Sequence, residues 1–184
     1  LKKRLAKLLS KENKELKHQL LIAARFLGVF IASFILVNIA ISFVPIEIFE
    51  YAVALLSAKM LELLGHSTSI IPSKPVRILL NNVHEIEISY LCTGLLESTV
   101  IVSAMMASLG ISIKKRVIGI IAGLAFVNVL NIFRIVITAN AIASMQDVAI
   151  VDFIHNLLFK VVLFVGVACY YALWFLLASR NNQQ

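Results

Sequence analysis

Long apolar runs with few charges dominate the pattern of hydrophobic and polar positions along this chain. They cover residues 21–44, 91–110, 117–144 and 156–178. About 20 apolar residues in a helix cross a hydrocarbon core of ~30 Å, so each run is long enough to be a transmembrane helix. Glycine, serine or alanine recurs in the last three runs and would let helices approach closely. The pattern predicts a four-span transmembrane helix bundle, and hence an all-α membrane protein.

The run at 46–64 differs from the others because four charged residues interrupt it: Glu47, Glu50, Lys59 and Glu62. An amphipathic helix that lies on the outer membrane surface fits this pattern better than a fifth span. We therefore expect a surface helix between the first and second spans.

Two β-prone stretches follow and flank Asn81-Asn82. Asparagine tolerates the positive φ angles of a tight hairpin turn. Beyond that turn, Ile86 and Ile88 alternate with Glu85 and Glu87, as in a half-buried strand. A short extracytoplasmic β-hairpin is therefore expected before the second span.

Basic residues are distributed unevenly and set the expected orientation. Seven of the 17 Lys and Arg residues precede residue 18, and three form the sequence KKR at 114–116. With four spans both groups lie on the same side of the membrane, which the positive-inside rule makes the cytoplasmic side. A fifth span would move KKR outside. We therefore expect a basic cytoplasmic leader at 1–20, a membrane-embedded domain at 21–178 with residues 45–90 outside, and a cytoplasmic tail at 179–184.

Composition supports a multi-pass membrane protein. Hydrophobic residues make up 60% of the chain and the mean hydropathy is +0.94, well above the share of roughly half that is usual in soluble domains. The net charge of +7 is therefore interpreted as membrane anchoring, and no nucleic-acid partner is expected. The two cysteines, Cys92 and Cys169, form no CxxC or Cys/His cluster, so neither a metal nor a cofactor is predicted.

Candidate chemistry begins with the stretch YLCTGLLES at 90–98. Cys92 would open the second span from the outside, where the positive end of the helix dipole favours a thiolate. Gly94 would allow another group to approach the backbone, and free N–H groups in the first helical turn can hold an oxyanion. A small residue packed at a helix start is the structural alternative for Cys92.

Polar residues also lie within the third span. Asn128, Asn131, Arg134 and Thr138 fall on one helical face. Arg134 is expected in the outer part of the bilayer, where an arginine is costly and is usually functional or paired. Glu97 on the second span lies at a similar depth, so a buried structural ion pair between Glu97 and Arg134 is the alternative to a catalytic role.

His155 opens the fourth span at the outer face, in the sequence DFIHN. The four-span topology would bring Cys92, Arg134 and His155 to one membrane surface from three separate helices. A cysteine, a histidine that takes its proton and an arginine that binds an anionic intermediate make a workable set for acyl transfer.

EIEISYLCTGLLES, NIFRIVI and DFIHN, in this order, resemble the exosortase and archaeosortase family of membrane transpeptidases over roughly residues 65–165. The resemblance implies that Cys92 is the nucleophile, that Arg134 is the arginine of an NxxR motif and that His155 occupies the third catalytic position. The supporting residues would be Thr93, Gly94, Glu97 and Asn131.

The same resemblance implies an activity and its partners. Such an enzyme cleaves a C-terminal sorting signal of exported proteins, made of a short motif, a transmembrane helix and a basic tail. It then transfers the new carboxyl end to a lipid or cell-surface acceptor without a cofactor. Two alternatives remain open from the residues: a cysteine protease without transfer, and a non-enzymatic membrane scaffold or transporter subunit in which Glu97, Arg134 and Lys160 pair.

Overall fold

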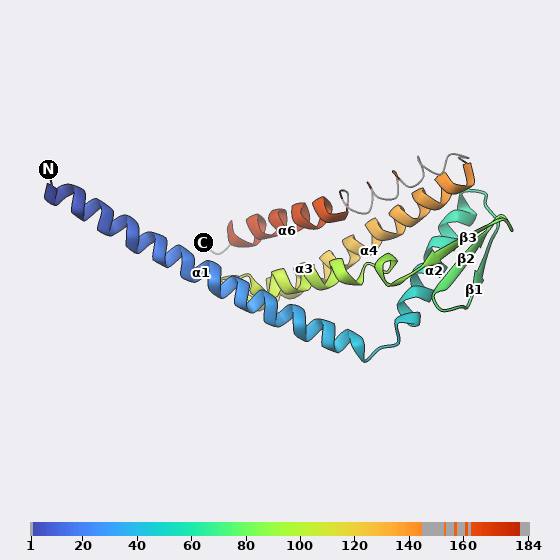
Figure 1. Cartoon of the computed structure of the whole chain (residues 1–184), viewed down its shortest axis with the longest axis horizontal. Coiled ribbons are helices and arrows are strands. Elements are labelled where there is room, and N and C mark those ends of the chain that lie inside the picture. Colours follow the sequence, from blue (N-terminus) through green and yellow to red (C-terminus); the bar gives the residue numbers. More distant parts are fainter. Residues whose placement is uncertain (1, 145–152, 154–156, 158–160, 162, 181–184) are drawn as a thin grey trace.

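Helices make up most of the chain in the computed structural model, which describes residues 2–144, 153, 157, 161 and 163–180 (Figure 1). A small sheet and a 3-10 turn interrupt them. The elements, in chain order, are α1 (Lys2–Ser42), α2 (Ile46–Leu63), β1 (Thr68–Ile71), β2 (Val76–Leu80), β3 (His84–Ile88), the turn η1 (Tyr90–Cys92), α3 (Leu95–Ala107), α4 (Ile113–Ser144) and α6 (Leu163–Arg180).

Three of the described helices are long and apolar enough to cross a membrane: Asn13–Ser42 within α1, Ile113–Ser144 and Leu163–Arg180. They correspond to the predicted first, third and fourth spans. The second predicted span, 91–110, is not confirmed, because α3 has 13 residues and is about 20 Å long. Gly94 has a φ of 71° and Gly110 a φ of 84°, so the helical backbone cannot run through either residue.

The KKR sequence, predicted in a loop, lies instead in the first turn of α4. Arg116 donates hydrogen bonds to the carbonyls of Ile111 and Met106, and Lys115 donates one to the carbonyl of Ala178 in α6. These bonds hold the end of α3, the start of α4 and the end of α6 together. Residues 2–20, within the predicted cytoplasmic leader, belong to α1, which begins at Lys2.

The predicted hairpin is confirmed and forms part of a larger antiparallel sheet with strand order β1-β2-β3. Asn81 and Asn82 connect β2 to β3 with φ angles of 53° and 58°. The register pairs Val76 with Ile88 and Leu80 with His84. The strand β1, which pairs with β2 and was not predicted, has four residues and too short a pattern to show alternation.

The sheet packs on α2. The presence of α2 confirms the helix predicted at 46–64. Val53, Ala54 and Ala58 of α2 form a buried cluster with Val76, Ile78 and Ile88 of the sheet and with Ile135 of α4. Glu50, one of the charged residues that interrupt this run, is buried and its carboxylate accepts a hydrogen bond of 3.2 Å from the Val76 amide. The sheet, α2 and one end of α4 therefore form a single core.

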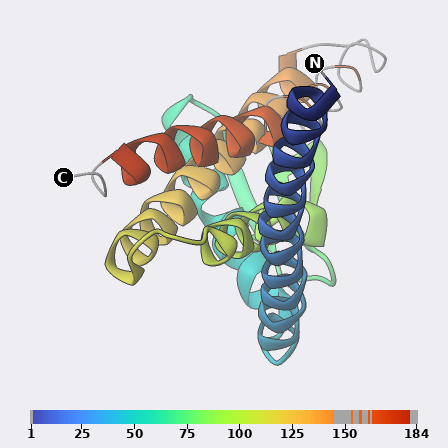
Figure 2. The ribbon, with the colours of Figure 1, turned by 90° about the vertical axis from the view of Figure 1, so that its left-hand side faces the viewer.

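The helices pack closely at the opposite end of α4. Figure 2 shows α1 and α6 on two sides of α3. At Gly119 of α4 an added Cβ would lie 2.1 Å from Trp174 Nε1, and the Tyr170 hydroxyl donates a hydrogen bond of 2.8 Å to the Gly119 carbonyl. The absence of a side chain at Gly119 therefore allows α6 to pack directly against α4.

Candidate functional site

Cys92 lies at the end of a tight turn between the sheet and α3. The Cys92 amide donates a hydrogen bond of 2.8 Å to the Ser89 carbonyl, and the Thr93 amide and hydroxyl both donate to the Tyr90 carbonyl. Cys92 is half-buried and Thr93 is buried. The local bonds of residues 89–93 thus fix the backbone that carries the thiol.

The expectation that Cys92 opens the helix itself is wrong by two residues. Thr93 and Gly94 separate it from Leu95, where α3 begins. The Thr93 hydroxyl accepts a hydrogen bond of 3.4 Å from the Leu95 amide, so one donor of the first helical turn is already used. The thiol therefore lies beside the helix start and outside its first turn.

Two residues of α4 hold this turn by consecutive backbone carbonyls. The Asn131 side-chain amide donates a hydrogen bond of 2.7 Å to the Cys92 carbonyl, and the Arg134 guanidinium donates a longer one of 3.5 Å to the Leu91 carbonyl. Asn131 has no exposed surface and Arg134 is 5% exposed. Residues three apart share a face of an α-helix, and this spacing matches two carbonyls that are adjacent in the turn.

Gly94 allows Asn131 to reach the turn. Its φ of 71° is left-handed, and an added Cβ would lie 3.3 Å from Cγ and Nδ2 of Asn131. A side chain at this position would therefore be strained in its backbone and would also press on the amide that holds the Cys92 carbonyl. Conformation and contact both favour glycine here.

Cys92 Sγ has polar and charged neighbours. The Ser89 hydroxyl donates to it at 3.8 Å, and the Arg134 guanidinium binds the carbonyl of the preceding residue, Leu91. On its apolar side, Cys92 packs against the core cluster formed by α2, the sheet and Ile135.

The structure brings together five of the seven site residues proposed from the sequence: Cys92, Thr93, Gly94, Asn131 and Arg134. Asn128, expected on the same face, is exposed and donates to the Leu124 carbonyl of its own helix. His155 lies outside the described residues.

Glu97 does not form the ion pair that was the alternative for Arg134. The structure describes both side chains, and between them only a Coulomb interaction is present. Glu97 is half-buried and faces a cavity between α1, α3 and α6.

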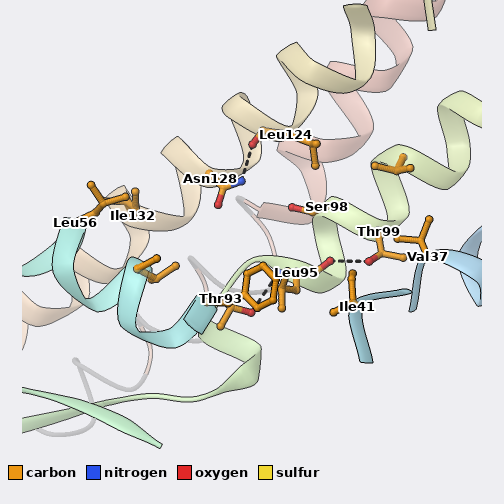
Figure 3. A pocket seen from close by; sticks show the side chains of 14 residues that line it. Val37, Ile41, Leu56, Thr93, Leu95, Ser98, Thr99, Leu124, Asn128 and Ile132 are labelled. Atoms are coloured by element: carbon orange, nitrogen blue, oxygen red, sulfur yellow. Dashed lines mark hydrogen bonds between the residues drawn. The ribbon is translucent and has the colours of Figure 1, made fainter. Parts of the chain in front are cut away.

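A second cavity, of about 370 Å³, adjoins the turn on its Thr93 side (Figure 3). Side chains from α1, α2, α3, α4 and the turn line it and are mostly aliphatic, with Thr93, Ser98, Thr99 and Asn128 as polar exceptions. Cys92 is not part of its lining. The turn therefore separates this apolar space from the thiol.

Sequence reasoning missed the parts of the site that depend on backbone carbonyls. The role of Ser89 as a donor to sulfur and the hydrogen bond from Asn131 to Cys92 have no local sequence pattern, since Cys92 and Asn131 are 39 residues apart. The spacing of Asn131 and Arg134 on one helical face was the available signal. Among the described residues, no group of three His, Cys, Asp or Glu side chains could hold a metal ion.

No protein-family model, curated protein or solved structure matches the chain. The function is therefore inferred from the site itself.

Proposed function

We propose that this chain is a membrane-embedded cysteine transpeptidase of the exosortase and archaeosortase type. The observation that carries the proposal is the attachment of the Cys92 turn to Asn131 and Arg134, which holds a buried guanidinium at the backbone carbonyl next to the cysteine. A scaffold has no need for a positive charge at a half-buried cysteine. A nucleophilic cysteine does need one, because the thiolate is its reactive form.

In the proposed reaction the Cys92 thiolate attacks the scissile carbonyl of an exported protein and a tetrahedral oxyanion forms. Arg134 stabilises that negative charge. The C–N bond then breaks, the leaving amine takes a proton from His155, and a thioester remains on Cys92. An acceptor amine or hydroxyl on a lipid or surface component gives its proton to His155 and attacks the thioester, which releases the Cys92 thiolate. Transfer to water instead would make the enzyme a protease.

The proposed topology has four spans, with the short α3 as the second, both termini in the cytoplasm and the Cys92 turn on the outer side of the plasma membrane. The distribution of basic residues supports this arrangement. A membrane-impermeant thiol reagent applied to spheroplasts should label Cys92 and leave Cys169 unlabelled. Ser112→Cys should also resist labelling, and its labelling from outside would place the site in the cytoplasm.

The decisive test replaces the sulfur. Cys92→Ala and Cys92→Ser remove or exchange one atom in a half-buried position, so the protein should still accumulate in the membrane. A co-expressed exported protein that ends in a short motif, an apolar helix and a basic tail should then remain uncleaved, since a serine hydroxyl is a much poorer nucleophile than a thiolate. Gel mobility and mass spectrometry of the substrate would show this.

Cys169 provides the matched control, because it is the other cysteine and is exposed on α6. Cys169→Ala should process the substrate at the wild-type rate. Wild-type cleavage by Cys92→Ala would refute the proposal. Mass spectrometry of the new carboxyl end would distinguish transfer from hydrolysis, because only transfer adds the mass of an acceptor.

A further inference from the structure

An apolar groove between α1, α3 and α6 lies on the side of α3 that the site does not use. Its volume is about 570 Å³. The lining residues come from all three helices, and most are aliphatic or aromatic: Phe34, Leu96, Val100, Ile101, Ala104, Phe164, Val167, Ala168 and Tyr171, together with Glu97. Two of the three helices, α1 and α6, are candidate membrane spans, so this groove is expected to open toward the bilayer.

Glu97 is the one charged residue in this lining, and its carboxylate has no hydrogen-bond or ion-pair partner among the residues that the structure describes. The other polar group, the Tyr171 hydroxyl, is already bonded to Ser108 Oγ at 2.9 Å. An ionisable side chain in an apolar, membrane-facing space is costly and usually marks a functional position. Within the described part of the chain no group fills this role, so a donor supplied by a bound partner fits Glu97.

The start of a transmembrane helix is such a donor. Its first four N–H groups have no partner within the helix, and the helix dipole places partial positive charge there. A carboxylate beside these groups acts as an N-cap. The groove also offers Ala104 and Ala168, and small residues of this kind let two helices approach closely in a membrane.

We propose that this groove receives the transmembrane helix of the substrate, with the first turn of that helix against Glu97. This inference rests on the proposed function, in which the cleaved bond precedes the substrate's helix. Glu97 lies in the first turn of α3, five residues after Cys92. A helix that begins at Glu97 therefore leaves the preceding extended segment near the thiol.

Photo-cross-linking tests docking without catalysis. A photoreactive residue replaces Ala168 in the full chain carrying Cys92→Ala and Cys169→Ala, reconstituted in phosphatidylcholine vesicles. The probe is a synthetic peptide with a Gly/Ser segment, about 20 Leu and Ala residues and a short Lys tail. The matched control places the same photoreactive residue at Ala125, which is exposed on α4 and outside the groove lining.

We expect the peptide to cross-link at position 168 several times more than at position 125. Glu97→Leu should lower the yield at 168 roughly fivefold, as expected for the loss of a helix cap, and Glu97→Gln should retain most of it because an acceptor oxygen remains. The inference is overturned if the yields at both positions are equal, if neither position cross-links, or if only lipid is cross-linked. It is also overturned if Glu97→Leu leaves the yield unchanged.

The outcome is independent of the test of the proposed function, because Cys92 is absent from the cross-linked protein. A specific cross-link together with normal cleavage by Cys92→Ala would support helix docking in the groove and refute the transpeptidase function. Failed cross-linking together with loss of cleavage in Cys92→Ala would refute docking and support the transpeptidase function.

Discussion

Gly94→Ala is the substitution that best tests how the Cys92 turn is held. Gly94 combines a φ of 71° with a Cβ position 3.3 Å from the Asn131 amide. A left-handed conformation costs a residue with a side chain about 1–2 kcal/mol. Displacement of Asn131 would weaken its 2.7 Å hydrogen bond to the Cys92 carbonyl, which contributes about 1 kcal/mol. The unfolding free energy should therefore fall by about 2–3 kcal/mol.

Gly65→Ala separates the two contributions. Gly65 has a φ of 91°, and an added Cβ would meet nothing within 4 Å. It should lose only the backbone contribution, about 1–2 kcal/mol. Both variants would be unfolded by denaturant in detergent, and the rate of alkylation at Cys92 would be followed in the Cys169→Ala background. Only Gly94→Ala should speed that alkylation, because only it loosens the turn.

A double-mutant cycle completes this test. With Asn131→Ala already present, adding Gly94→Ala should cost only the backbone contribution, so the two effects should not add. If Gly94→Ala and Gly65→Ala lower stability equally and leave alkylation at Cys92 unchanged, Asn131 does not hold the turn and the reasoning is refuted.

Three further outcomes follow from contacts described above. Asn131→Leu keeps the volume but removes the donor to the Cys92 carbonyl, so stability measured by denaturant should fall by about 1–3 kcal/mol; an unchanged midpoint would contradict this bond. Gly119→Ala should lower the melting temperature by overpacking against Trp174, at a cost of about 1–3 kcal/mol, and Trp174→Leu should restore part of it; additive losses would contradict the contact. The Lys74 ammonium holds the pKa of the Glu47 carboxyl below its ordinary value, and Glu47 raises the pKa of Lys74. The small stabilisation by this pair should therefore be constant from about pH 5 to about pH 9. It should be lost as pH falls through the lowered pKa of Glu47 or rises through the raised pKa of Lys74. If Lys74→Met and wild type have the same melting temperature within that pH range, the pair does not stabilise the fold.

The sequence pattern predicted those parts of the fold that depend on local chemistry. The hairpin followed from Asn81-Asn82, whose positive φ angles few other residues adopt, and α2 followed from its mixed charge and apolar pattern. The length of α3 did not follow, because hydropathy is continuous across residues 91–110 while the backbone angle at Gly94 keeps the helix from beginning before Leu95. An apolar run indicates that a segment can lie in apolar surroundings, but it does not fix where the helix begins.

The proximity of Cys92 and Arg134 could be predicted from topology alone, since both were placed at one membrane surface. The contacts that hold them could not, because Asn131 and Arg134 bind backbone carbonyls that every residue possesses. The burial of Glu50 also depends on the position of the Val76 amide, which only the folded sheet determines. Long-range contacts to the backbone are therefore the part of the site that the sequence could not predict.

In the proposed topology α3 is the second span, and its shortness would then affect the lipid around it. A helix of 13 residues is about 10 Å shorter than the ~30 Å hydrocarbon core, and a bilayer accommodates such hydrophobic mismatch by thinning locally. We expect headgroups and water to dip toward the Cys92 turn. A thioester formed there would meet water as well as its acceptor, so the yield of transfer over hydrolysis should increase with the density of acceptor in that thinned patch.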